Sequence, residues 1–457
     1  RRKNWIKQFA RTWRCWVMGS KWKRVIVADV CTSIVDCVNK TAPVVEYPTD
    51  YKMIRTPNIR AGKVTLDGCR YVEKEVYETW TRRSKPQKGD VLLTREAPLG
   101  EVGIITTDEN IFLGQRIMQY RADKNKIDPY FLLYSFLSPD LQQQFSMHEG
   151  SGSVVSHIRV GDCSKFEINI PPLEIQRSIV EILKSLDDHI DVNIKINQTL
   201  EQMSQTLFKS WFVDFDPVID NALDAGNPIP EALQSRAELR QKVRNSENFK
   251  PLPADIRVLF PAEFEETELG YAPKGWMTNR LENILELAYG KALKKTERTN
   301  GNYPVYGSGG VDGTHNEYLV KGPGVIVGRK GTVGSLHWEN KNFYPIDTVF
   351  FVKPKEYYSL VYCYQLLKTL GLENMNTDAA VPGLNRNNAY RLEVVTPTQS
   401  IIAKFTNIIQ TIQHKMDSNH NETENLTALR DTLLPKLISG ELSLENQPDL
   451  VTQTEPA

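Results

Sequence analysis

A glycine-rich stretch, GPGVIVGRKGTVGS at 322–335, is the first candidate for chemistry in this chain. Glycines at this density allow tight turns and a close approach of the backbone to a ligand. Arg329 and Lys330 add two adjacent positive charges. A nucleotide-binding P-loop, however, requires G-x-x-x-x-G-K-[ST] after a strand. Here Lys330 is followed by a glycine and only then by Thr332, so the stretch does not have the P-loop pattern.

Other catalytic patterns fail on their spacing as well. An amino-methyltransferase tetrad needs Asp or Asn directly before two prolines and an aromatic residue, but INIPPLE separates Asn169 from its prolines and DPYF at Asp128 lacks the second proline. The histidines show neither H-x-x-x-H nor H-E-x-x-H spacing, and no cysteines form C-x-x-C, so no metal site is predicted. GSGSVVSH is not a G-x-S-x-G elbow. The sequence therefore predicts a binding protein and no catalytic residues.

The composition sets the class of protein. A chain of 457 residues is too long for one core and predicts two to four domains. Its 40% hydrophobic and 25% charged residues are typical of a soluble globular protein. The apolar run YFLLYSFL is far shorter than the roughly 18 residues of a membrane span. The cysteine pattern favours a reducing compartment, so we expect a cytoplasmic protein with no membrane contact.

The charge is unevenly distributed near the start of the chain. The formal net charge is zero, yet residues 1–17 contain no acid and the bases Arg1, Arg2, Lys3, Lys7, Arg11 and Arg14. Met18 opens MGSKWKRVIVADV, which has the form of a natural start. We expect residues 1–21 to be an N-terminal extension that is not native or is disordered. The alternative is a basic arm that binds nucleic acid.

The sequence contains two copies of the same succession of segments. GDVLLTREAPLGEVG at 89–103 aligns with the glycine-rich stretch, so that Arg95 matches Arg329 and Gly100 matches Gly334. WKRVIVADVC from Trp22 resembles WMTNRLENIL from Trp276, and FEINIPPLEIQRSIVEIL resembles LEVVTPTQSIIAKFTNII. The separation between matched segments falls along the chain, so the second copy is shorter in its globular part. A repeated module fits recognition better than catalysis.

Each copy ends in a long helical segment. Glu174 to about Asp214 contains no Gly or Pro, and apolar residues recur there at spacings of three and four; the segment from Ser400 to about Ile438 repeats the pattern, with Pro435 in its last turn. Each segment is about 40 residues long, or about 60 Å as a helix. A narrow apolar stripe of this length predicts a coiled coil, and two equal helices in one chain predict that they pair. Asn193 and Asn197 interrupt the stripe and would set its register.

The globular parts are predicted to be mixed α/β. Short β-rich runs such as VLLTREAP, GVIVGR and DTVFFVKP are bounded by Gly, Pro or Asp. Helices are expected at 128–145 and 356–370. Residues 216–275 are richer in Pro and charge, which predicts a short helix and an extended linker. The fold class is thus an α/β (α+β) two-copy protein with two globular domains, each followed by a long helix.

Basic and amide side chains are concentrated in the loops of both copies. Arg reads guanine edges, Asn reads adenine edges, and Lys holds phosphates, so this concentration indicates DNA binding. The residues that we expect at the DNA are Lys52, Arg55, Asn58, Arg60, Arg95, His157, Arg159, Lys291, Lys294, Lys295, Tyr306, Ser308, His315, Arg329, Lys330, Asn385 and Arg386. Arg95 and Arg329–Lys330 occupy shared positions, so they are expected to contact the phosphate backbone. Specificity is expected in unshared loops, including Lys52–Arg60 and Lys291–Arg298.

Several of these segments together resemble one family. GSGSVVSHIRVGDCSKFEINIPPLEIQRSIVEIL, LFKSWFVDFDPV, FPAEFEETELGYAPKGW and AAVPGLNRNNAYRLEVVTPTQ, with the glycine-rich stretch, are similar to the DNA specificity subunit of type I restriction-modification enzymes. The resemblance extends from about Lys21 to Leu444. It implies target-recognition domains at 22–170 and 276–395 and conserved helices at 171–215 and 396–444 that pair as an antiparallel coiled coil. Composition predicts a linker at 216–275 and a disordered tail at 445–457.

The resemblance also implies partners. Such a subunit is not an enzyme and binds no cofactor; it reads a bipartite target on double-stranded DNA. It directs two methyltransferase subunits, which use S-adenosylmethionine to methylate adenine, and restriction subunits, which use ATP and Mg²⁺, in bacterial phage defence. The alternatives left open by the sequence are a DNA-reading methyltransferase or nuclease fusion and a non-catalytic scaffold or regulator.

Overall fold

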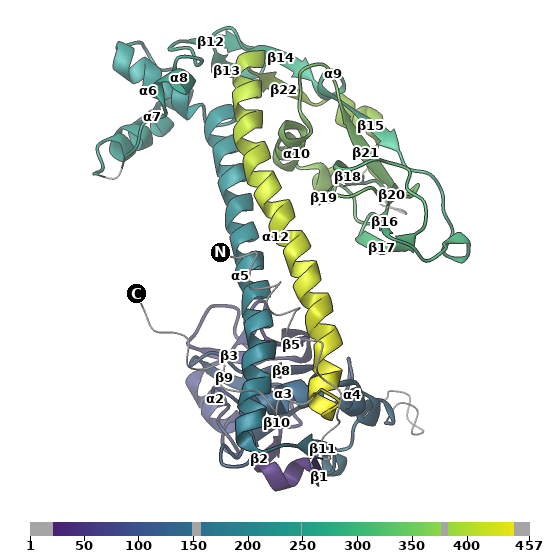
Figure 1. The fold of residues 1–457 in the computed structure, drawn as a ribbon. Coiled ribbons are helices and arrows are strands. Elements are labelled where there is room, and N and C mark those ends of the chain that lie inside the picture. Colours follow the sequence, from purple (N-terminus) through teal and green to yellow (C-terminus); the bar gives the residue numbers. More distant parts are fainter. Residues whose placement is uncertain (1–21, 149–156, 248, 376–382, 443–457) are drawn as a thin grey trace, which may run out of the picture. The chain divides into compact units, whose positions relative to one another are not determined.

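A computed structural model describes residues 22–148, 157–247, 249–375 and 383–442 of the chain (Figure 1). The predicted extension at 1–21 and the predicted tail at 445–457 lie outside the described residues. The chain divides into two compact units, residues 1–192 with 423–457 and residues 193–422. No helix in the described part of the chain is both long and apolar enough to span a membrane.

A six-stranded sheet forms the centre of the first unit. In order across the sheet, its strands are β2 (Cys31–Asp36), β10 (Ile117–Ala122), β7 (Val91–Thr94), β8 (Val102–Ile104), β5 (Gly62–Val64) and β4 (Ile59–Arg60). A three-stranded sheet has the order β6 (Arg70–Tyr71), β3 (Tyr51–Ile54) and β9 (Asn110–Leu113), and β1 (Lys23–Ile26) pairs with β11 (Glu167–Ile170). The helices are α2 (Lys74–Trp80), α3 (Pro129–Leu137) and α4 (Pro139–Ser146), with short 3₁₀ turns η2 (Val27–Val30), η3 (Thr56–Asn58) and η4 (Val160–Asp162).

The second unit repeats this plan with fewer strands. Its main sheet has the order β15 (Leu285–Tyr289), β21 (Val349–Pro354), β18 (Gly324–Gly328) and β19 (Leu336–Glu339). A second sheet has the order β17 (Gly310–His315), β16 (Tyr303–Gly307) and β20 (Tyr344–Pro345), and β14 (Met277–Arg280) pairs with β22 (Glu393–Thr396). The shorter elements are α9 (Leu281–Ile284), η5 (Lys295–Glu297), α10 (Leu360–Thr369), η6 (Leu372–Asn374) and α11 (Arg386–Tyr390).

The strand orders confirm the predicted two-copy fold. The order β2-β10-β7-β8 of the first unit matches β15-β21-β18-β19 of the second. The parallel pair β3–β9 matches the parallel pair β16–β20, and the antiparallel pair β1–β11 matches β14–β22. In the first unit, β5 and β4 extend the main sheet beyond the shared four strands. These extra strands account for part of the greater length of the first copy.

The two long helices, α5 (Leu173–Phe212) and α12 (Gln399–Ser439), pair in opposite directions (Figure 1). Within the second unit, Asn197 donates a hydrogen bond to the carbonyl of Met416 at 3.0 Å. Further along α5, the ring of Phe208 lies 5.7 Å from that of Phe405, which comes earlier on α12. Contacts that advance along one helix while receding along the other require an antiparallel pair. The predicted pairing is therefore confirmed.

In the first unit, the same two helices complete the core behind the sheet. Leu183 and Leu186 of α5 share one buried apolar cluster with Leu426 and Leu433 of α12. An ion pair joins Asp187 to Arg430 at 2.9 Å. The regular three- and four-residue spacing of the apolar residues thus serves two contacts at once, with the partner helix and with the α/β domain.

Two expected elements differ from the structure. The helix expected at 128–145 is two helices, α3 and α4, because Ser138 adopts an extended conformation before Pro139, which begins the second helix. The segment expected as one short helix and an extended linker is instead largely folded. It forms α6 (Asp216–Ala225), α7 (Glu231–Arg244), α8 (Ala254–Arg257) and a hairpin of β12 (Phe264–Thr267) and β13 (Gly270–Pro273).

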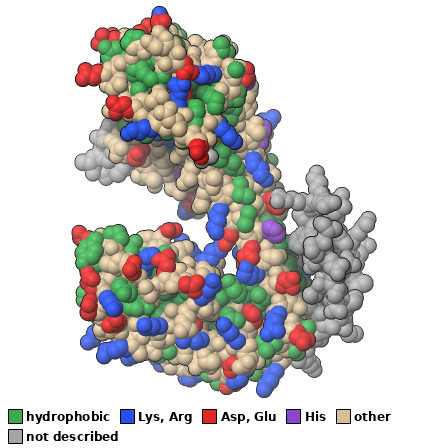
Figure 2. All heavy atoms as spheres, turned by 90° about the vertical axis from the view of Figure 1, so that its left-hand side faces the viewer, with side chains coloured by type: hydrophobic (Ala, Val, Ile, Leu, Met, Phe, Trp, Pro, Cys, Tyr) green, Lys and Arg blue, Asp and Glu red, His purple; other side chains and the backbone are tan. Residues whose placement is uncertain are grey.

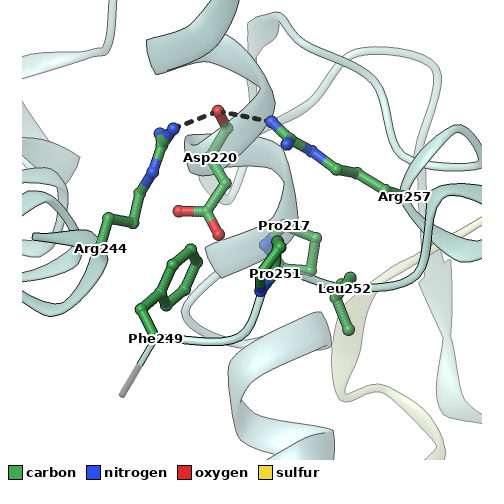
Figure 3. Close-up of a pocket in the computed structure, with 7 residues that line it drawn as sticks. All are labelled: Pro217, Asp220, Arg244, Phe249, Pro251, Leu252 and Arg257. Atoms are coloured by element: carbon green, nitrogen blue, oxygen red, sulfur yellow. Dashed lines mark hydrogen bonds between the residues drawn. The ribbon is translucent and has the colours of Figure 1, made fainter. Parts of the chain in front are cut away.

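Acid–arginine pairs hold this folded segment together. Asp216, Asp220 and Asp224 recur every four residues on α6 and pair in turn with Arg236, Arg240 and Arg244 of α7. Residues four apart lie on one helix face, so the three aspartates of α6 face the three arginines of α7 in the same order. Figure 3 shows Arg244 and Arg257 converging on the carbonyl oxygen of Asp220, each at 3.2 Å, beside Phe249 and Pro251. Simple composition could not indicate this matched pairing.

The polar contact in the helix pair gives a stability test. Asn419 is fully buried and donates to the side-chain oxygen of Asn197 at 2.8 Å. We expect Asn197→Leu to lower the free energy of unfolding by about 1–3 kcal/mol, because it leaves a buried amide without its partner. The double variant Asn197→Leu/Asn419→Leu should regain part of that loss. Urea unfolding followed by circular dichroism measures both, with Thr199→Leu on the exposed face as the control; a single variant as stable as the wild type would contradict the expectation.

Candidate nucleic-acid interface

The turns that follow β7 and β18 hold Arg95 and Arg329 in the same backbone frame. The amide of Arg95 donates to the carbonyl of Arg116 at 2.8 Å, and the amide of Arg329 donates to that of Thr348 at 2.9 Å. The carbonyls of the two arginines accept hydrogen bonds from Ile158 and Leu384, at 3.0 and 2.8 Å. The alignment of Arg95 with Arg329 thus corresponds to an equivalent place in the fold.

The glycines of these turns have a structural reason. Gly100 and Gly334 close the two turns, each donating at 2.9 Å to the last residue of the preceding strand. Both have positive φ angles, +84° and +70°, which glycine adopts without steric cost. A Cβ on Gly334 would also lie 2.4 Å from the backbone of Leu372 and Glu373. The turn geometry and this close packing therefore account for the glycines. A bound nucleotide is not needed to explain them.

The two arginine side chains are presented differently. Arg95 donates from Nη1 to the carbonyl of Ile158 at 3.1 Å. Arg329 instead donates to the carbonyl of Asp347 at 3.0 Å, and its guanidinium stacks on Tyr289 and Phe350. A common backbone therefore carries side chains in different surroundings.

In the first unit, several predicted residues meet around the turn after β7. Thr56 donates to the carbonyl of Ala97 at 2.9 Å, which brings η3 and the neighbouring Arg55 against this turn. Glu101 at the end of the turn lies 3.9 Å from Arg60. His157 and the exposed Arg159 flank Ile158, which bonds to the turn. Lys52 is engaged in an ion pair with Glu109.

In the second unit, the turn after β18 gathers a similar set. Lys330 is exposed and forms a β-bridge with Gly383, close to Asn385, the N-cap of α11, and to Arg386, its first residue. Ser308 accepts from the amide of Thr332 at 3.4 Å and therefore lies against the same turn. The exposed lysines Lys291, Lys294 and Lys295 follow β15, and Lys295 pairs with Asp312 at 3.0 Å.

Three of the predicted residues are buried and have structural contacts. Asn58 caps η3 and donates to the carbonyl of Asp67 at 2.8 Å. Tyr306 donates to Glu339 at 2.9 Å, and burial raises the pKa of its hydroxyl above the ordinary range. His315 accepts from the amide of Thr299 at 3.1 Å. Residue type alone could not separate these buried groups from surface ones, and burial keeps all three side chains from direct contact with DNA.

Tyr289 is a surface residue that sequence reasoning missed. It ends β15, is 48% exposed and lies between two arginines, whose guanidinium carbons are 4.9 Å (Arg329) and 4.7 Å (Arg386) from its ring centroid. Both distances fall within the range of a cation–π interaction. The available signal was an aromatic residue directly before Gly290 at the end of a strand.

The distribution of charged side chains over the wider surface does not by itself identify the interface. On the face drawn in Figure 2, Lys and Arg side chains are interspersed with Asp and Glu. Within the described ranges, no three His, Cys, Asp or Glu side chains come together in a way that could hold a metal ion. The candidate interface is therefore defined by the two equivalent turns and their neighbours.

The fold and these turns define a class: a two-copy recognition protein with paired long helices. The family model described as the type I restriction modification DNA specificity domain matches residues 19–202 and 273–427. The chain belongs to this family. It is the DNA specificity subunit of a type I restriction-modification system, a sequence-specific DNA-binding subunit that is not itself catalytic. The methyltransferase or nuclease fusion and the scaffold are thereby set aside.

Curated relatives agree with this assignment. The type I restriction enzyme HindI specificity subunit of Haemophilus influenzae is 27% identical over 403 residues, covering 78% of this chain and 87% of the relative. The MjaIX specificity subunit of Methanocaldococcus jannaschii is 26% identical and covers 78% of each chain. A solved S subunit of a type I restriction-modification system from M. genitalium matches with a TM-score of 0.52 and 18% identity over 92% of this chain and 96% of that one, which supports the fold.

The glycine that closes the second turn provides a test of this geometry. We expect Gly334→Ala to lower the free energy of unfolding by about 2 kcal/mol or more, because the φ angle is strained for alanine and the new methyl group meets backbone. Gly309→Ala, where a Cβ would meet nothing within 4 Å, is the matched control and should change stability little. Thermal unfolding measures both, and equal effects of the two substitutions would contradict the assigned role.

Proposed function

We propose that the two target-recognition domains, residues 22–170 and 276–395, each read one half of a bipartite target on double-stranded DNA. The helical regions 171–215 and 396–444 connect them. The observation that carries this proposal is the common backbone frame around Arg95 and Arg329. One scaffold used twice, with different side chains around it, suits two half-sites of different sequence.

The shared residues are suited to the phosphate backbone. Arg95 and Arg329 stand on turns whose position is the same in both domains, so they cannot by themselves distinguish two sequences. Lys330, which stands where the first domain has Glu96, adds a second exposed positive charge to its turn. Phosphate contacts position a protein on DNA, whereas base contacts specify its site. Further exposed or half-buried residues complete the proposed interface: Lys52, Arg55, Arg60, His157 and Arg159 in the first domain, and Lys291, Lys294, Lys295, Ser308, Asn385 and Arg386 in the second. Specificity is assigned to the unshared loops among them.

The remaining chemistry belongs to partner subunits. In this proposal two methyltransferase subunits bind the chain and methylate adenine with S-adenosylmethionine, and restriction subunits use ATP and Mg²⁺ to cleave unmodified DNA. This chain binds none of these cofactors, and the complex acts in the cytoplasm. Membership of the specificity family supports this division of labour.

The proposed phosphate contacts can be tested by salt dependence. We expect Arg329→Ala and Lys330→Ala each to weaken binding to target and unrelated DNA alike, and to reduce the slope of log affinity against log salt by about one. Fluorescence anisotropy across a salt series measures this. Lys274→Ala, which removes an exposed lysine paired with Glu263 at 2.5 Å outside the second recognition domain, is the control and should leave the slope unchanged. A loss confined to one half-site sequence would contradict the phosphate role.

The function itself is tested most directly in cells. Methylome sequencing with and without the gene should reveal adenine methylation at one split motif that disappears on deletion. The same motif should return when the gene is restored, and exchange of residues 276–395 for those of another specificity subunit should change one half of the motif only. An unchanged methylome would contradict the proposal, as would methyl transfer by the purified chain alone.

A further inference from the structure

The second domain contains an arginine–tyrosine–arginine stack around Tyr289. The guanidinium of Arg386 lies 4.7 Å from the Tyr289 ring centroid and 5.6 Å from that of Tyr390. Tyr289 itself packs edge-on against Phe350, with ring centroids 5.0 Å apart. The hydroxyl of Tyr390 accepts from the amide of Leu287 at 2.9 Å, so this second ring is also held. Two aromatic rings therefore contact the Arg386 guanidinium and restrict where it can lie.

The guanidinium groups of this stack differ in their hydrogen bonds. Arg329 has a hydrogen bond to the carbonyl of Asp347. The Arg386 side chain, in contrast, makes no hydrogen bond or ion pair with any residue in the described part of the chain, and its Nε is buried without a partner. Two like charges beside one ring repel each other unless an acceptor joins them. The outer nitrogens of Arg386 thus remain available for a ligand with two acceptor atoms.

The stack is specific to the second domain. Asp36 occupies the place of Tyr289 in the first sheet, since it lies opposite Met118 as Tyr289 lies opposite Phe350. Asp36 pairs with Arg83 at 2.6 Å. The place of Arg386, two residues after the residue that bonds to the turn arginine, is taken by Val160. A feature that differs at two positions between equivalent frames can discriminate between two half-sites.

We propose that Tyr289 is a positioning residue for base recognition, and that it holds Arg386 to read a guanine in the half-site bound by the second domain. Guanine offers two adjacent acceptors, O6 and N7, in the major groove, which match the planar fork of arginine. Arg329, fixed by its own hydrogen bond, contacts the phosphate backbone beside it. This inference rests on the proposed function, because it assumes that the face around the β18 turn meets DNA.

The test uses the full chain in complex with its methyltransferase subunits and a duplex that carries its methylated motif. Anisotropy compares this duplex with duplexes in which each guanine of either half-site is replaced in turn. For the wild type, loss of the recognised guanine should weaken binding about tenfold or more. Tyr289→Leu and Arg386→Gln should each remove most of that discrimination while leaving discrimination in the other half-site intact. Tyr289→Phe, which keeps the ring, should retain it.

Controls separate the possible outcomes. Tyr318→Leu removes a similarly exposed tyrosine of the same domain, which packs on Tyr303, and should behave as wild type. Full discrimination in Tyr289→Leu, or an equal loss of affinity for every duplex, would overturn the inference; the second result would identify a phosphate clamp. If Tyr289→Leu does not fold, Arg386→Gln decides the question. Failure of the wild-type complex to prefer its motif would instead refute the proposed function itself.

Discussion

The pairing of α5 with α12 is the interaction on which the two units depend. The C-terminal half of α12 contributes Leu426, Leu433 and Leu437 to the core of the first unit. The C-terminal part of α5 contributes Phe208, Trp211 and Phe212 to the core of the second. Each unit therefore needs a helix that belongs to the other copy to bury its apolar surface. This exchange makes the helix pair a part of both domains as well as the connection between them.

The start of α5 shows how firmly a long helix is fixed to its domain. Gln176 is fully buried and accepts a hydrogen bond from the amide of Asp128 at 2.8 Å. It donates in turn to the carbonyls of Lys126 and Pro171. A buried amide that satisfies three backbone groups is costly to replace, because each group would lose its partner. In the motif PPLEIQ, the glutamine thus has a structural role that is independent of any partner subunit.

The equivalent turns separate two tasks. Backbone hydrogen bonds determine where Arg95 and Arg329 stand, and these bonds join main-chain groups, so they do not depend on the type of the neighbouring side chains. Those neighbours then differ: Asp36 and Val160 stand in the first domain where Tyr289 and Arg386 stand in the second. Substitution at such positions changes the presented surface without disturbing the frame. A protein that must read two different half-sites on one design benefits from this separation.

The sequence by itself determined the repeat, the order of the matched segments and the two long helices, because these depend on local patterns: apolar spacing, glycine density and proline position. It also located the turns that carry Arg95 and Arg329. Only the tertiary structure decided that Tyr306 and His315 are buried and that Tyr289 lies between two arginines, since burial and stacking arise from segments far apart in the chain. The same holds for residues 216–275, where matched Asp and Arg side chains on α6 and α7 fold a segment whose composition resembles a linker. Local pattern sets the elements, and contacts between distant residues set which side chains reach the surface.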